Sequence, residues 1–183
     1  MNDGWLLDSA TGSSADPVGE KYYGKYRGVV INNIDPMQIG RLQVAVPDVS
    51  AALPTSWAMP CLPVGGIQMG IFAVPPLGAG VWVEFEQGDA DYPIWSGCYW
   101  GSAAEIPATA LLSPAPVPAI TLQTPLQNSI TLSDQLGIMI KSSTGATITV
   151  NETGITIQNG QGASIVMAGP SVMINDDALV VIS

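Results

Sequence analysis

Residues 159–183 of the chain read NGQGASIVMAGPSVMINDDALVVIS, and this stretch decides the fold. Apolar residues alternate with small or polar ones, and glycine, asparagine, aspartate and proline interrupt the pattern at short intervals. Period-two alternation predicts short β-strands, because successive side chains of a strand point to opposite faces. No helical periodicity is present, and the most apolar residues stand last. The stretch therefore predicts strands whose apolar face needs a partner.

The same pattern runs through residues 120–183. Apolar residues two positions apart recur at short intervals, and Gly, Asn, Ser, Asp or Gln lies between them. The pairs are Ile130/Leu132, Ile138/Ile140, Ile148/Val150, Ile155/Ile157, Ile165/Met167, Val172/Ile174 and Val180/Ile182. A repeat of short strands and tight turns is typical of a β-helix or β-solenoid.

One copy of this repeat cannot bury its own apolar face. Each strand offers only two inward side chains, and a lone meander of short strands has free edges and no second layer. Three copies around a common axis bury the pairs, and each strand is then expected to pair with strands of its neighbours. We predict a homotrimeric needle with a core of Ile130, Leu132, Ile138, Ile140, Ile148, Val150, Ile155, Ile157, Ile165, Met167, Val172 and Ile174.

Residues 21–100 carry a different strand pattern, separated by the turn sequences NNIDPMQIGR (32–41) and EQGDADYP (86–93). They predict a small antiparallel barrel of about five strands. The residues that follow period two are Val29 and Ile31, then Leu42, Val44 and Val46, then Val81, Val83 and Phe85. Residues 1–20 predict an extended arm of unassigned function, 101–119 a proline-rich extended linker, and 120–183 the needle.

Composition excludes several functions. The net charge is −10 and the chain has no histidine. A nucleic-acid surface needs clustered cations, and Ser-His-Asp or Cys-His catalysis and most zinc sites need histidine. We expect no catalytic residues, no cofactor and no metal. Cys61 and Cys98 are expected as thiols, although the sequence leaves open whether they pair.

Several residues allow a functional interpretation, but a structural role explains each of them better. Glu84 and Glu86 alternate with core residues, and Asp89 and Asp91 lie in a turn, so a glycosidase carboxylate pair is disfavoured. The spacing of Asp134, Asp176 and Asp177 fits no calcium loop. The glycine-rich segments lack the P-loop lysine. The aromatic residues can stack on nucleic-acid bases but better suit core packing or partner contact: Tyr22, Tyr23, Tyr26, Trp82 and Trp95.

An ordered set of residues in the first half carries a family resemblance. The set is Tyr23-Gly24, Asp35-Pro36, Gly40-Arg41, Val46-Pro47, Trp57-Ala58, Pro75-Pro76, Gly80, Val83, Phe85, Gly88-Asp89, Pro93 and Gly97. It resembles the N-terminal OB-fold of contractile-tail spike proteins: phage baseplate assembly protein V, cell-puncturing spikes and type VI valine-glycine repeat spikes. Residues 154–183 resemble their C-terminal triple-stranded β-helix.

This resemblance implies an all-β protein: a five-stranded OB-fold barrel followed by an intertwined triple-stranded β-helix formed by a homotrimer. It implies a spike at the baseplate centre, driven through the target envelope when the sheath contracts. The fused hub domains of type VI spikes are missing, so a separate trimeric hub protein is expected at the barrel. A PAAR-repeat tip protein is expected on Asp176, Asp177, Ala178, Leu179, Val180, Val181, Ile182 and Ser183.

The departures from the family are also informative. There is no lysozyme insertion, and the His-x-His iron site of some phage spikes is missing, which favours a separate cap. We expect synthesis in the cytoplasm, incorporation into a phage tail-like particle and contact with a membrane only on firing. The alternatives are a trimeric adhesin or carbohydrate-binding fibre tip and, more remotely, a cell-wall-degrading enzyme. The sequence leaves open a phage, extracellular or membrane-anchored machine.

Overall fold

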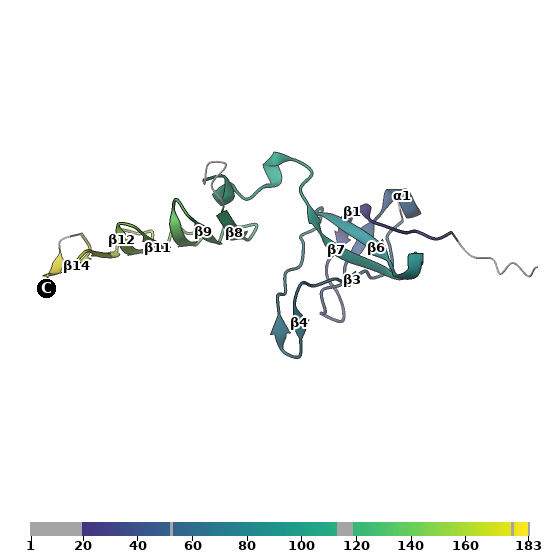
Figure 1. The fold of residues 1–183 in the computed structure, drawn as a ribbon, viewed down its shortest axis with the longest axis horizontal. Helices are drawn as coiled ribbons and strands as arrows, with labels where there is room; N and C mark the ends of the chain where they lie inside the picture. The colour runs from purple at the N-terminus through teal and green to yellow at the C-terminus, as the bar shows by residue number, and fades with distance from the viewer. Residues whose placement is uncertain (1–19, 52, 113–118, 177, 183) are drawn as a thin grey trace, which may run out of the picture. The chain divides into compact units, whose positions relative to one another are not determined.

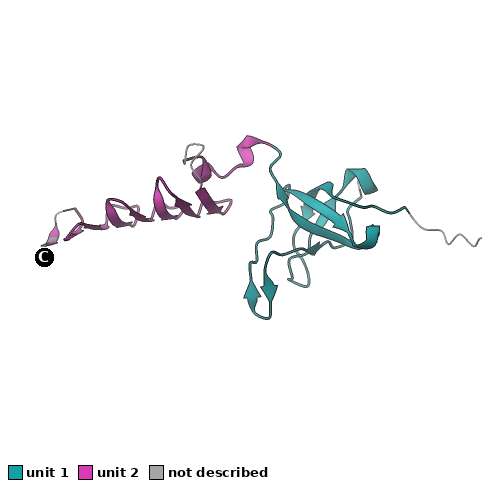
Figure 2. Cartoon of the chain, in the orientation of Figure 1, with its two compact units in different colours: residues 1–101 teal, residues 102–183 magenta. Residues whose placement is uncertain are grey.

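The computed structural model describes residues 20–51, 53–112, 119–176 and 178–182 of the 183-residue chain. The chain divides into two compact units, Met1–Gly101 and Ser102–Ser183 (Figure 2). Both are built mainly from strands, so the all-β prediction is confirmed. In the described residues, no helix is long and apolar enough to cross a membrane. The predicted N-terminal arm lies, apart from Glu20, outside the described residues.

The first unit holds a five-stranded sheet with the order β2-β1-β6-β7-β3 (Figure 1). The first and last strands meet through paired backbone hydrogen bonds between Leu42 and Ala58, which close the sheet into a barrel. A short helix follows β2, and a two-stranded hairpin follows β3. The bounds are β1 Tyr26–Asn32, β2 Gln43–Ala45, α1 Pro47–Ser50, β3 Met59–Pro60, β4 Gly65–Gly66, β5 Met69–Gly70, β6 Gly80–Phe85, η1 Glu86–Gly88 and β7 Pro93–Tyr99.

The barrel core consists of side chains that alternate along the strands. Its buried members are Val30, Leu42, Val44, Val46, Ala58, Val81, Val83, Phe85 and Trp95. The predicted faces of β2 and β6 are therefore confirmed. Val29 and Ile31 do share one face of β1, but that face is exposed, and Val30 between them enters the core.

The described part of the predicted linker is not extended throughout. It contains two short 3-10 helices, η2 Ala103–Glu105 and η3 Ala108–Leu112. Pro107 directly precedes η3, where the missing N–H of proline costs no helical hydrogen bond. Thr109 is buried, and its hydroxyl donates a 2.7 Å hydrogen bond to Gln123 of the next strand. This segment therefore packs onto the second unit; residues 113–118 lie outside the description.

The second unit is an antiparallel meander in which every strand pairs with the next one along the chain (Figure 1). Its eight strands form a single sheet. They are β8 Ala119–Gln123, β9 Ser129–Ser133, β10 Gly137–Lys141, β11 Thr147–Asn151, β12 Gly154–Gln158, β13 Ser164–Ala168, β14 Ser171–Ile174 and β15 Leu179–Ile182.

Local side-chain hydrogen bonds explain the tight turns of the meander. The Asn151 side chain accepts from the backbone N–H of Thr153, and that of Asn159 accepts from Gln161 and Ala163. Such asparagine turns offer the backbone partners that strands no longer supply. Gly154 has a φ of +134°, and a Cβ there would collide with the carbonyl oxygen of Met167. Only glycine allows the two turns to stack this closely.

Candidate functional site

The register of the meander aligns its apolar pairs into one continuous surface, which we call the apolar strip. Ile140 of β10, for example, lies opposite Ile130 on one side and Ile148 on the other. Because directly paired residues point to the same face, the whole series lies on one side of the sheet. The strip consists of Ile120, Leu122, Ile130, Leu132, Ile138, Ile140, Ile148, Val150, Ile155, Ile157, Ile165, Met167, Val172, Ile174, Leu179 and Val181.

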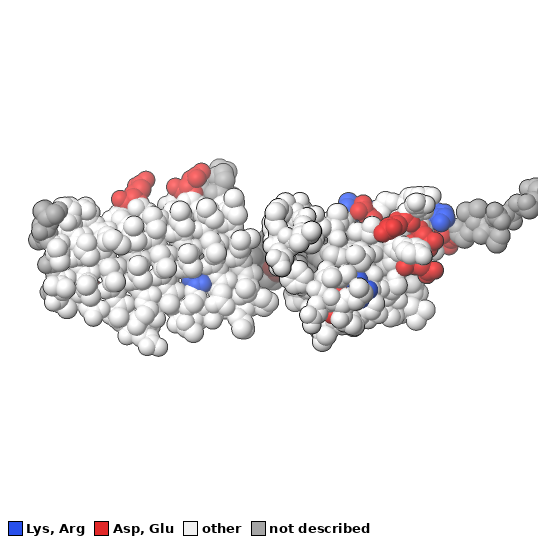
Figure 3. Space-filling view, turned by 90° about the horizontal axis from the view of Figure 1, so that it is seen from below, with Lys and Arg blue, Asp and Glu red and all other residues white. Residues whose placement is uncertain are grey.

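The strip is open to solvent in the single chain. Three of its residues, Ile155, Met167 and Val172, are half-buried. The exposed fraction of the others ranges from 37% at Ile174 to 65% at Ile120 and Leu122. Contiguous apolar surface of this extent marks an interaction site on a water-soluble protein. Among the described strands of this unit, Lys141 is the only charged residue, and Figure 3 shows few charged groups on the side of the unit that faces the viewer.

The opposite face of the sheet is polar where it begins. Ser129, Thr131 and Ser133 of β9 are buried, while Ile130 and Leu132 between them are exposed. Helix η3 contacts β8 and β9, so the chain's own 3-10 segment lies against this polar end. The unit thus covers hydroxyl groups and leaves its most apolar face free, which is the reverse of a self-sufficient fold.

The strip corrects two expectations from the sequence. Strands β9–β14 each have neighbours of the same chain on both sides, so pairing of each strand with other copies is wrong for this ladder. The tight turns connect consecutive strands too closely for another chain to enter between them. The last apolar pair also differs: the sequence predicts Val180/Ile182, whereas the register aligns Leu179 with Ile174 and Val181 with Val172 on the strip.

The barrel carries one concentrated polar site, in the loop 35–41. Asp35 is buried and accepts backbone N–H groups of Met37, Ile39 and Arg41. The Arg41 guanidinium adds two hydrogen bonds, 2.7 Å from Nη2 and 3.0 Å from Nε. This guanidinium, assisted by the backbone donors, holds the pKa of Asp35 well below its usual range. The site fixes a loop; it offers no free group for chemistry.

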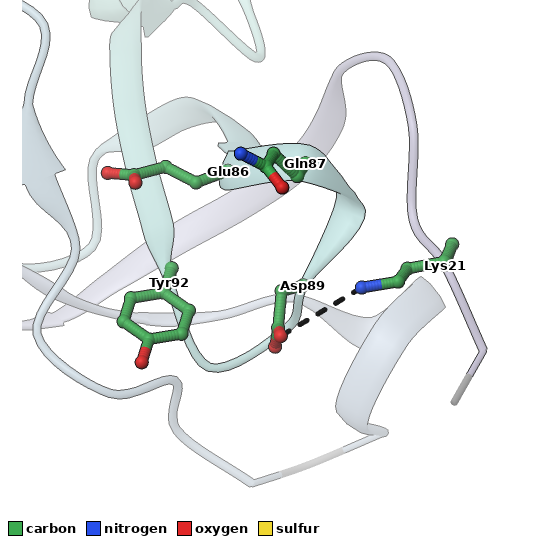
Figure 4. Close-up of a pocket in the computed structure, with 5 residues that line it drawn as sticks. All are labelled: Lys21, Glu86, Gln87, Asp89 and Tyr92. Carbon is green, nitrogen blue, oxygen red and sulfur yellow. Dashed lines mark ion pairs between the residues drawn. The ribbon is translucent and has the colours of Figure 1, made fainter. Parts of the chain in front are cut away.

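The carboxylates near the end of β6 do not converge. Glu84 pairs with Lys25 at 3.1 Å. A small hollow of about 210 Å³ is lined by Lys21, Glu86, Gln87, Asp89 and Tyr92 (Figure 4). There Asp89 accepts the backbone N–H of Asp91 and lies 3.9 Å from Lys21, while the Glu86 carboxylate points away (Figure 4). The geometry is that of a turn with an exposed ion pair.

The aromatic side chains of the barrel pack on one another. Tyr22, Tyr26 and Phe85 form a cluster with centroid distances of 5.6–6.1 Å, in which Tyr26 meets both other rings edge to face. Trp95 is buried and donates its indole N–H to the Gly40 carbonyl oxygen at 3.0 Å. Trp82 contacts Tyr99, and Arg27 lies over both rings. Tyr23 alone of the five predicted aromatic residues is largely exposed.

Each of the two units matches a known protein family. Residues 26–100 match the family described as the type VI secretion system/phage-baseplate injector OB domain. Residues 119–180 match the phage baseplate V C-terminal trimerisation domain, and this range contains nearly all of the apolar strip. The chain belongs to the phage baseplate V spike family. None of the curated proteins compared with this baseplate spike matches it.

The family match indicates that other copies of the chain cover the strip. A trimerisation domain supports a homotrimer, and the baseplate family supports a role in a phage tail-like particle. All twelve residues predicted for the trimer core lie on the strip. Four residues of the strip lie outside the predicted core: Ile120 and Leu122, which the sequence predictions did not include, and Leu179 and Val181, which were predicted for tip docking instead. The first two were recognisable as one further apolar pair, next to Thr121, directly after the proline-rich segment.

Proposed function

We propose that three copies of this chain form the central spike of the baseplate of a contractile injection system or phage tail. The three meanders wind about one axis as an intertwined β-helix, and the needle is driven through the target envelope when the sheath contracts. The barrels attach to a separate trimeric hub protein. Structural baseplate families are generally not enzymes, and we propose no catalytic activity for this chain.

The exposed apolar strip is the observation that carries this proposal. Three sheets arranged as a triangular prism can turn their strips toward a shared core, and each sheet then needs no second layer of its own. Eight strands at about 4.8 Å spacing give each side a length of roughly 35–40 Å if the strands lie across the axis. Hydrogen bonds along the whole ladder favour a stiff needle, which suits penetration.

The free end of the meander is the proposed docking surface for a PAAR-repeat tip protein. Strand β15 pairs with β14 on one side, and no described strand pairs with its other edge. Leu179 and Val181 of this strand are exposed. Three such edges around an axis would present unpaired backbone groups and apolar side chains together, a surface that a β-rich cap can cover. Asp177 and Ser183 of the predicted docking set lie outside the described residues.

The position of the chain in the assembled particle tests the proposed function. Particles purified through an affinity tag on this chain should contain hub, tube and sheath proteins, and cryo-electron microscopy should place the chain on the baseplate axis. Density on peripheral fibres would instead support the adhesin alternative. Release of soluble fragments from cell walls by the purified trimer would support the enzyme alternative.

A further inference from the structure

The barrel carries an apolar hairpin that is separate from the apolar strip of the needle. In the hairpin formed by β4 and β5, Gly65 pairs with Gly70 and Gly66 pairs with Met69 (Figure 1). Ile67 and Gln68 form the two-residue loop between the strands. Ile67 at the tip is 97% exposed, and Met69, Ile71 and Phe72 are exposed as well. The sequence has no charged residue between Asp48 and Glu84. A projecting, uncharged and apolar hairpin indicates a surface that is buried in an assembly.

A groove on the same barrel has the matching chemistry. It encloses about 510 Å³ between the base of the hairpin and β7, and its lining includes Leu62, Pro63, Ile71 and Trp95. Cys61 and Cys98 also line it, and both are free thiols. The volume lies within the range of sites that enclose apolar ligands. The hairpin pairs from Val64 and Ile71 to Gly66 and Met69, so Ile67 at its tip is held away from the groove residues at its base.

We propose that, in the homotrimer, the hairpin tip of each barrel inserts into the groove of the next barrel, with Ile67 as its anchor. This inference rests on the homotrimer of the proposed function but not on its puncturing role. The hairpin and the groove are two different surfaces of one chain, which is what a head-to-tail contact requires. Around a threefold axis such contacts close into a ring of three and leave no tip or groove free.

The chain connectivity argues for a second copy as the occupant. In the trimer, each barrel is joined to its needle strand β8 through residues 101–118. Eighteen residues span at most about 60 Å even when fully extended. Three barrels tethered to one needle therefore face one another at an effective concentration on the order of millimolar, at which even a weak apolar contact forms. A free partner must compete with this local concentration.

The native cysteines in the groove allow a direct test by cross-linking. Ile67→Cys places a thiol on the tip, and a mild oxidant should link it to Cys61 or Cys98 of the neighbouring chain. A link within one chain would leave a band at the size of the monomer, so a covalent trimer reports contacts between chains. A non-reducing denaturing gel should show covalent trimers, since a head-to-tail ring joins all three chains.

Two controls define the outcome. Leu77→Cys offers a thiol at a position that is 62% exposed in a turn outside the hairpin, and it should give at least tenfold less covalent trimer. Ile67→Cys combined with Cys61→Ser and Cys98→Ser should lose the trimer band.

Equal cross-linking by Ile67→Cys and Leu77→Cys, in protein that still sediments as a trimer, would overturn the proposal and leave the hairpin for another protein such as the hub. Bands that stop at the dimer would overturn it in favour of a twofold tip-to-tip contact. Protein that sediments as a monomer would contradict the homotrimer itself, which separates the two failures.

Discussion

The substitution Ile165→Asp tests whether the apolar strip of the meander forms the core of the needle. Ile165 lies on the apolar strip between Ile157 and Ile174 and is 39% exposed in the single chain. In the trimer, the three copies of this residue should come together around the axis. Each aspartate would then remove an apolar contact and place a carboxylate in a dry core.

The cost has two parts. Full burial of an isoleucine contributes about 1.5–3 kcal/mol, so the remaining 39% contributes roughly 0.6–1.2 kcal/mol per chain. Burying an unpaired carboxylate costs several kcal/mol more per chain, whether it stays charged or takes up a proton. Three chains together lose roughly 10 kcal/mol or more, which lowers the association constant by about seven orders of magnitude.

The assay is size-exclusion chromatography with light scattering, which distinguishes the 19.0 kDa chain from a particle three times as heavy. Val166→Asp is the matched control, because Val166 is the next residue of β13 and points to the other face. It should remain trimeric, as should Ile165→Val, which costs about 0.5–1.5 kcal/mol per chain. If Ile165→Asp stays trimeric while Val166→Asp dissociates, the other face of the sheet forms the core.

Three further predictions concern other parts of the chain. Because folding lowers the pKa of Asp35, the ionised carboxylate stabilises the barrel at pH values above the ordinary aspartate pKa of about 3.9. This stabilisation is lost as the pH falls through the lower pKa of the folded state. Asp35→Asn should therefore lower the melting temperature at pH 7 and flatten the acid part of the melting-temperature profile; an unchanged profile would exclude Asp35 as its cause. Gly154→Ala should destabilise the needle by about 1–3 kcal/mol per chain in thermal unfolding. Gly169→Ala should destabilise it less, because the space around the added Cβ is open there. Equal effects of the two substitutions would show that close packing at Gly154 does not require glycine. Deletion of residues 177–183 should leave a trimer but abolish co-purification of a PAAR-repeat protein, and retained binding would move the docking surface away from the end of the meander.

The needle shows how far periodicity predicts a fold. Where apolar residues alternate with polar ones, as in Ile148-Thr149-Val150, the predicted face agrees with the register. Where they run together, alternation cannot choose a face, and a slip of one residue reverses it. Residues 179–182 read LVVI, and the left-handed conformations of Asn175 and Asp176 before them set the register instead.

The barrel follows the same rule. Val29-Val30-Ile31 is a run of three apolar residues, and only the pairing of Val30 with Val44 inside the barrel core distinguishes Val30 from its neighbours. The Asp35–Arg41 site was recognisable as a pair of short motifs, but its five hydrogen bonds depend on the three-dimensional course of the loop. The hairpin at residues 65–70 has no strand periodicity, because glycine occupies three of its four paired positions.

The oligomeric state of the unmodified chain across a concentration series tests the central claim most directly. Sedimentation velocity should detect a single species of three chains down to nanomolar concentration, because the apolar strip has no other means of burial within one chain. A folded monomer that keeps the β-sheet circular-dichroism signal of the meander at those concentrations would contradict the account.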